Sequence, residues 1–501
     1  MKKFTFVFLL IGTLCKAQEP ITKIAAQISQ EDLRKNLYHL ASAEMEGRSM
    51  GTKGDTLASQ YIAKHFEANN LIAPYKKKRY FQAVKTNKKI TKSASMSVGN
   101  KDYEFLNGWT YVLRNTETFK LNNVPVVFAG YGLREDAYND FKNIDVKGKA
   151  VLLIPGQPQD ASGRYVLSGN NQPARVTSYQ TILKELGAVA VIMYNPRFRQ
   201  DSLVQRRQLH ALYINEYGAA PQPTLPTLSI SEERANELLG DVNIRTIIAS
   251  MDQDDAPQSF DLKNKISADV KVAIEKGIAP NVIGIIKGTD KNAEAVIISA
   301  HHDHDGKHGD RIYYGAVDNA SGTVAIMEIA RLMNVAKQNG LRPKRTIIFA
   351  SYTGEERGGV GSHYLANNPV VPIEKTWAVI NIDMMGRVDT FYSGRRADSN
   401  YAYILVQDTL NRNLRNAVYK ANETVNLKLD THYEQPQFKQ RRLTGSDQYP
   451  FYLKGVPFIR IDCGFSKDYH QLTDTPDKIN YQLLTNQTQL AFLTTWNLAN
   501  N

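Results

Sequence analysis

Three short, largely apolar runs in the second half of the chain constrain its fold most. They are AVIISA at 295–300, RTIIFAS at 345–351 and WAVINID at 377–383, and all three are rich in β-branched residues without polar alternation. Strands that are buried on both faces have this composition, and such burial is typical of parallel sheets. The segment 321–340 carries the apolar spacing of a helix between the first two runs. The pattern predicts an α/β fold with a mostly parallel central sheet flanked by helices.

The rest of the chain divides into segments with different patterns. Residues 18–117 contain two helical patterns, at 28–42 and 54–70, joined by a glycine-rich turn. We expect 18–117 to form the N-terminal part of the domain whose main part is 261–501. Residues 118–260 contain strand and helix patterns but few clustered acids or histidines, so we expect a structural insert. Its predicted strands lie at 124–133, 148–156 and 187–196, and its predicted helices at 179–187 and 231–239.

The first 17 residues have the pattern of an export signal. Lys2 and Lys3 precede an apolar run that is too short to span a membrane, and small residues allow cleavage after Ala17. We therefore expect a periplasmic or secreted protein, and no later run is long enough for a membrane helix. After cleavage Cys463 is the only cysteine, so the mature chain can form no internal disulfide, and we expect Cys463 to be a small buried residue.

The net charge does not indicate a nucleic-acid partner. The formal charge is +12, but lysines and arginines are scattered, and the densest basic run is KKKR at 76–79. A basic patch for nucleic acid would need these charges to be clustered. We expect that short run to be a solvated face.

Acids and histidines gather where the predicted strands end. The first run is followed by HHDHDG at 301–306, the second by Glu355 and Glu356, and the third ends in Asp383. Asp318 stands just before the predicted crossover helix, and His470 lies much later in the chain. Open α/β sheets bind their ligands beyond the carboxyl ends of the strands, so we expect these side chains to form one site.

This set of side chains fits zinc. Imidazole and carboxylate groups are zinc ligands, and two histidines with three carboxylates suffice for two ions if one carboxylate bridges them. The adjacent like charges of Glu355 and Glu356 then have an explanation. If Glu356 binds a metal, its charge is compensated, and Glu355 remains free to take a proton from water that the metal has made acidic.

Spacing alone does not select the ligand from the histidine cluster. The pair His301 and Asp303 at the strand end favours His301, with Asp303 orienting its imidazole. His302 would then point to the other face of the sheet. We expect His304 and His308 to be loop residues.

These segments resemble the co-catalytic zinc exopeptidases, which include leucyl-type aminopeptidases and glutamate carboxypeptidase relatives. The resemblance covers nearly the whole mature chain and implies that 118–260 is a protease-associated insert domain in a zinc-exopeptidase fold. The matching segments follow in the family's order as HLASAEMEGRSMGTKGDTLASQYIA (39–63), AHHDHDG (300–306), GAVDNASGT (315–323), ASYTGEERGGVGS (350–362), NIDMMG (381–386) and YHQLTDTPDKI (469–479).

The resemblance also implies a role for each site residue. Two zinc ions would be held by five ligands, which are His301 and Asp383 for one ion, Glu356 and His470 for the other, and Asp318 as the bridge. Glu355 would be the general base, and Asp303 would orient His301. Tyr469 would stabilise the oxyanion, and the Asp318–Asn319 peptide bond would be cis. Gln448 stands where the family often has histidine, which leaves its contribution to substrate contacts open.

The implied function is an exported di-zinc aminopeptidase with peptide substrates, and the sequence leaves its oligomeric state open. A carboxypeptidase or dipeptidase would need a cationic group for the terminal carboxylate, such as Arg387, Arg441 or Arg442. A glutaminyl cyclase-like transferase uses a single zinc in this family, and the pair His301 and Asp383 argues against it. A non-catalytic binding protein would lack the ligands.

Overall fold

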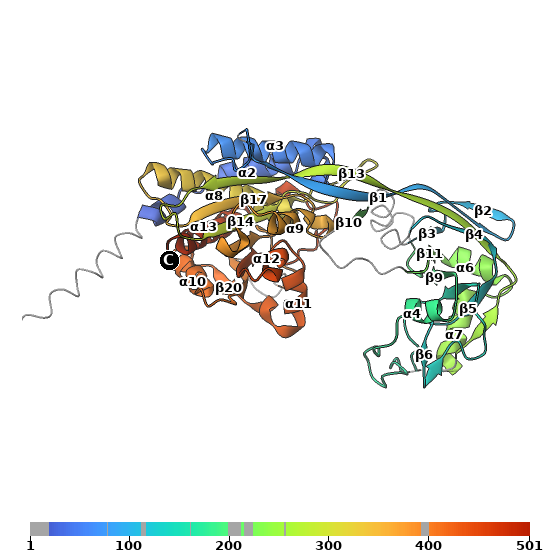
Figure 1. The fold of residues 1–501 in the computed structure, drawn as a ribbon. Helices are drawn as coiled ribbons and strands as arrows, with labels where there is room; N and C mark the ends of the chain where they lie inside the picture. Colours follow the sequence, from blue (N-terminus) through green and yellow to red (C-terminus); the bar gives the residue numbers. More distant parts are fainter. Residues whose placement is uncertain are drawn as a thin grey trace, which may run out of the picture. The chain divides into compact units, whose positions relative to one another are not determined.

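The computed structural model describes residues 20–77, 79–111, 117–160, 162–198, 212–214, 224–254, 257–391 and 400–501 (Figure 1). The chain forms two compact units. Unit 1 consists of residues 1–86 and 277–501, and unit 2 consists of residues 87–276. The predicted insert at 118–260 falls within unit 2, and the predicted export signal lies outside the described residues. Among the residues that are described, no helix combines the length and apolarity needed to cross a membrane.

Unit 1 is built on a mixed sheet whose centre is parallel. Strand β14 (Ala295–His301) lies between β17 (Thr346–Tyr352) and β18 (Thr376–Ile382) and runs parallel to both. Every residue of β14 is buried, as the unalternating apolar run predicted. The predicted mostly parallel α/β sheet is confirmed. The sheet continues through β13 (Ile266–Ile286), β21 (Phe458–Asp462), β19 (Tyr401–Gln407) and β20 (Lys428–Asp430).

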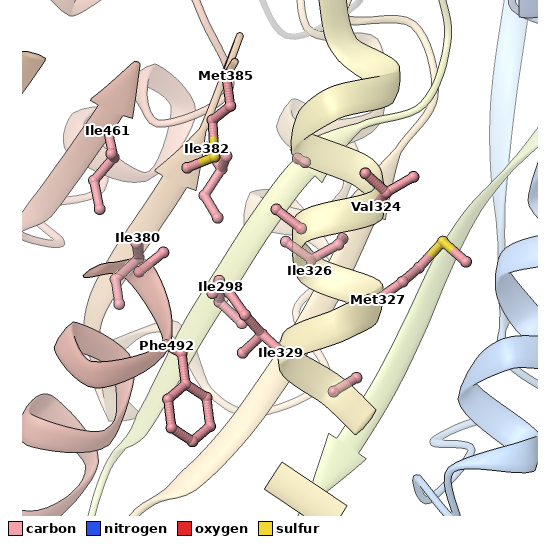
Figure 2. Packing of buried hydrophobic residues seen from close by; sticks show 14 of the residues in the cluster. Ile298, Val324, Ile326, Met327, Ile329, Ile380, Ile382, Met385, Ile461 and Phe492 are labelled. Carbon is pink, nitrogen blue, oxygen red and sulfur yellow. The ribbon is translucent and has the colours of Figure 1, made fainter. Parts of the chain in front are cut away.

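Helices cover both faces of this sheet because successive side chains of each strand point to opposite sides. Ile298 of β14 packs in one apolar cluster with α8 (Ser321–Gln338) and α13 (Tyr481–Asn500). Ile297 packs in another cluster with α9 (Val360–Asn367) and α12 (Tyr449–Leu453). Figure 2 shows the first cluster around the crossover helix α8. Further α-helices of this unit include α2 (Gln30–Leu40), α3 (Lys53–Ala68), α10 (Leu414–Val425) and α11 (Pro436–Thr444).

The predicted helices near the start of the chain begin at capping side chains. Ser29 accepts a hydrogen bond from the Asp32 amide at the start of α2, and Thr52 accepts one from the Asp55 amide at the start of α3. Such caps satisfy amides that have no partner within the helix. Both helices bury their apolar faces in the cluster that contains α8. Cys463, just beyond β21, is buried as predicted.

Unit 2 contains a second sheet with its own core. Strands β5 (Val126–Ala129), β8 (Ala150–Leu153) and β9 (Ala190–Tyr194) fall within the three predicted runs and pair in parallel. The two predicted helices are α4 (Tyr179–Glu185) and α6 (Glu232–Leu239). The sheet is completed by β11 (Thr227–Ile230), β3 (Trp109–Tyr111) and β12 (Ser259–Asp261). Its identity as a protease-associated domain stays a prediction.

Substitution of a central core residue should test the burial of the sheet. Ile298→Ala removes a fully buried side chain from β14 and should lower the free energy of unfolding by about 2–5 kcal/mol. Ile278→Ala is the matched control, because Ile278 lies in a strand but is 67% exposed, and it should cost less than about 1 kcal/mol. Urea denaturation of both variants measures the difference, and equal losses would contradict the assigned core.

Candidate metal centre

The carboxyl ends of the central strands bring the predicted site residues together at one edge of the sheet. His301 ends β14, Asp383 follows β18, and Glu356 lies in the short helical turn η4 (Glu355–Arg357) after β17. The Nε2 atom of His301 is 3.4 Å from Oδ1 of Asp383 and 3.4 Å from Oδ1 of Asp318. Each of these side chains is buried, so their charges interact in a poorly solvated environment.

Asp318 also faces a second group of ligand atoms. The Nε2 atom of His470 lies 3.1 Å from Oδ2 of Asp318 and 3.3 Å from Oε1 of Glu356. One oxygen of Asp318 therefore faces His301, while the other faces His470. A carboxylate that offers one oxygen to each of two ligand groups has the arrangement of a bridge between two cations.

His304 also belongs to this site, which the sequence did not predict. It does lie in a loop, but it is fully buried, with Nδ1 2.9 Å from Oε1 of Glu356 and 3.9 Å from Oδ2 of Asp318. The neighbouring Asp305 places Oδ2 3.0 Å from Nδ1 of His470. Side chains alternate between the two faces only within a strand. The spacing of His304, which lies beyond the strand, therefore could not predict where its side chain points.

The other clustered histidines lie apart from these groups. His302 points away from the ligands, as predicted, with Nε2 3.1 Å from Oδ1 of Asp55 and Nδ1 2.9 Å from the Ser351 hydroxyl. His308 packs edge-on against Tyr313, with ring centres 5.6 Å apart.

Mutual contacts between acids and histidines control the protonation of the site. Burial disfavours the charged form of Asp318, but hydrogen bonds from His301 and His470 hold its pKa well below the usual range. Burial likewise opposes the charge on His470, yet Glu356 and Asp305 raise its pKa to about 11. The clustered carboxylates therefore favour binding of a cation. Zinc binds neutral imidazole and ionised carboxylate ligands, so the donor set fits the metal.

Glu355 differs from its neighbour Glu356 in its surroundings. Its backbone amide donates a hydrogen bond of 3.0 Å to Oδ1 of Asp303. Burial raises the pKa of the Glu355 carboxyl well above its usual value, and the negative charges of Asp447 and Glu356 add to this effect. A carboxyl group with a raised pKa holds a proton more readily than an ordinary glutamate, which suits an acid–base role.

Two supporting residues were missed in the sequence. Arg460, inside the apolar strand β21, donates from Nη2 to Oδ2 of Asp383 at 2.9 Å and from Nε to Oδ2 of Asp462 at 2.9 Å. Asp474 accepts hydrogen bonds from the backbone amides of Val317 at 3.0 Å and Asp318 at 3.3 Å. Both fix the backbone or carboxylate of a candidate ligand. The available signal for Arg460 was the pair of charged residues, Arg460 and Asp462, in an otherwise apolar strand.

The remaining sequence expectations concern Asn319, Gln448 and Tyr469. The Asp318–Asn319 peptide bond is cis, as predicted. Gln448 is buried and donates from Nε2 to the carbonyls of Arg442 and Leu443, each at 2.9 Å, so it supports backbone rather than lining the pocket. Burial raises the pKa of the Tyr469 hydroxyl, which keeps it protonated as a hydrogen-bond donor.

A pocket opens beside the candidate ligands. It joins three acids to three arginines and several apolar or aromatic groups. The lining residues are Asp318, Glu355, Asp383, Met384, Arg441, Arg442, Gly445, Arg460, Phe465 and Tyr469. Arg387, the third arginine proposed from sequence as a carboxylate contact, is not among them and pairs with Asp468.

Comparisons with known proteins place this site in a family context. Residues 281–495 match the model described as Peptidase family M28. A probable glutamate carboxypeptidase of Zea mays is 32% identical over 201 residues, which are 39% of this chain and 26% of the relative. An aminopeptidase of Mus musculus is 35% identical over 128 residues, which are 25% of this chain and 16% of the relative. The chain therefore matches only about a quarter or less of the length of these curated relatives.

The fold is also similar to a solved structure. An aminopeptidase from Aneurinibacillus sp. strain AM-1 superimposes with a TM-score of 0.57 at 18% identity, covering 96% of both chains. This likeness extends over the length of the chain and supports the fold assignment.

Removal of the buried arginine should destabilise the metal-free protein. Arg460→Met removes the guanidinium that donates to both Asp383 and Asp462, and breaking a buried ion pair of this kind typically costs about 3–5 kcal/mol. Arg415→Met is the control, because its pair with Glu434 is partly exposed and should contribute about 1 kcal/mol or less. Chemical denaturation in the presence of a chelator gives both values, and an equally small loss in the two variants would contradict the positioning role of Arg460.

Proposed function

The chain belongs to peptidase family M28, and we propose that it is an exported zinc aminopeptidase that binds two zinc ions and releases N-terminal residues from peptides. One observation carries this proposal. Asp318 offers one oxygen to His301 and the other to His470, with Asp383 and Glu356 completing the two groups. Export rests on the signal pattern at 1–17.

The proposed ligands follow from the two groups. His301, Asp383 and Asp318 would hold one ion. Asp318, Glu356 and His470 would hold the other, because Nε2 of His470 lies 3.1 Å from Asp318 and 3.3 Å from Glu356. His304, hydrogen-bonded to Glu356, would fix that carboxylate. Bound zinc supplies Lewis acidity, which polarises a peptide carbonyl and lowers the pKa of water.

The chain's own residues would then move the proton and stabilise charge. Glu355 would take a proton from the attacking water and transfer it to the amine that leaves. Tyr469 lines the same pocket, and its protonated hydroxyl would donate a hydrogen bond to the developing oxyanion. Asp303 would hold Glu355 and His301 in fixed positions relative to each other. Its carboxylate accepts a hydrogen bond from the Glu355 amide, and its backbone oxygen lies 3.2 Å from Nδ1 of His301.

Two enzyme alternatives stand beside this proposal, and zinc content distinguishes one of them. A carboxypeptidase or dipeptidase would use the same ligands, and the arginines that line the pocket favour it as the second candidate. A glutaminyl cyclase-like transferase would bind one zinc. The zinc content of the protein therefore separates the peptidases from the transferase.

Zinc counting should give about two ions per chain. His470→Ala removes a proposed ligand of one ion and should lower the content to about one. His39→Ala is the control, because the His39 ring packs at a tilt against Tyr61, with ring centres 4.2 Å apart, and His39 is not among the proposed ligands. It should leave the zinc content unchanged. Elemental analysis after dialysis against a weak chelator measures all three proteins. A wild-type content near one would overturn the paired site.

Substitution of the proposed base should separate catalysis from metal binding. Wild-type protein should cleave a leucyl chromogenic amide but not its N-acetylated form, since an aminopeptidase needs the free amine. Glu355→Gln should lower kcat by about 10²–10⁴-fold and keep both zinc ions. Glu374→Gln, which removes an exposed carboxylate, should behave as wild type. Near-normal turnover by Glu355→Gln would show that another group is the base.

A further inference from the structure

The arginines that line the pocket have hydrogen-bond donors that the proposed chemistry does not use. Among its three arginines, Arg460 is fully engaged with Asp383, Asp462 and two backbone carbonyls. Arg441 and Arg442, adjacent on helix α11, are not engaged in this way. Both line the same pocket as the acids.

Arg442 is a buried cation with unused donors. Its side chain is only 4% exposed, and its guanidinium carbon lies 4.0 Å from the centre of the Tyr433 ring and 4.1 Å from that of Phe465. Asp462 is 3.5 Å from Nη2, yet neither Nε nor Nη2 has a hydrogen-bond partner. Buried donors are rarely left unpaired, so a ligand in the pocket is the natural acceptor.

The position of Arg442 is fixed before any ligand arrives. The two rings restrict the guanidinium on its faces, and Gln448 holds the Arg442 carbonyl through a hydrogen bond of 2.9 Å. A guanidinium held in this way loses little conformational entropy when it binds a ligand.

Arg441 adds a second positive charge at the mouth of the pocket. Its side chain is exposed, and it lies over Phe465 at 5.6 Å from the ring centre. Among the described residues, no carboxylate forms an ion pair with it. The adjacent arginines therefore place two positive charges in the lining of the pocket.

We propose that Arg441 and Arg442 bind a carboxylate of the peptide substrate next to the scissile bond. This inference rests on the proposed peptidase function and specifies its substrate class. A guanidinium matches a carboxylate through paired hydrogen bonds, and the aromatic rings would shield that contact from water. The carboxylate has two possible sources, namely an acidic side chain or the free C-terminus of a short peptide.

Three pairs of matched substrates distinguish these sources. Alanylalanine against its C-terminal amide tests the terminal carboxylate. Glutamyl-alanine amide against glutaminyl-alanine amide tests an acidic residue before the bond, and alanyl-glutamate amide against alanyl-glutamine amide tests one after it. With zinc-loaded wild-type protein, at least one carboxylate substrate should have a kcat/KM about tenfold or more above its neutral partner.

Variants then test whether the arginines cause the preference. Arg441→Gln and Arg442→Gln should each reduce the ratio toward one, mainly through KM. Lys439→Gln removes a positive charge from the same helix without altering the pocket lining, so it should keep the wild-type ratio. Arg441 is exposed, so its variant tests the inference even if Arg442→Gln does not fold.

The outcomes separate this inference from the function on which it rests. Cleavage of all three pairs within threefold of equality, or a preference that survives both arginine substitutions, would overturn the carboxylate site and leave the peptidase assignment intact. Failure to cleave any of the six substrates would overturn the peptidase assignment and this inference together.

Discussion

The site depends on buried carboxylates of like charge held close together. Asp318, Asp383 and Glu356 lie close together where little water can screen them, and neighbouring histidines and Arg460 offset their charge. Such a cluster is unfavourable without cations. The fold holds this cluster together because the parallel strands β14, β17 and β18 end at the same edge of the sheet. Helices packed on both faces keep these strands in place.

Fixed neighbours keep each candidate ligand in position. Arg460 engages one oxygen of Asp383, which leaves the other for His301. Asp474 accepts hydrogen bonds from the backbone amides of Val317 and Asp318. Arg48 is fully buried and donates to carbonyls on the loops that carry the ligands, including those of His302 and Gly315. Contacts of this kind fix the orientation of metal ligands, and the metal site depends on that orientation.

The sequence predicted the parts of this arrangement that follow from simple periodicity. Fully apolar runs identified the central strands, and the rule that ligands bind at strand ends brought His301 and Asp383 together. His304 was missed because a loop has no fixed side-chain period. Arg460 was missed because its role depends on Asp383, 77 residues away in sequence. Gln448 was considered as a substrate contact, but a buried amide that bonds backbone cannot be distinguished from a pocket residue by sequence alone.

Anomalous X-ray scattering at the zinc edge, from crystals grown with zinc, tests the central claim most directly. The account predicts two peaks about 3.5–4 Å apart, one on each side of the Asp318 carboxylate. The peak beside Asp383 and His301 and the peak beside Glu356 and His470 should both be present. A single peak, or peaks away from Asp318, would contradict the bridged pair.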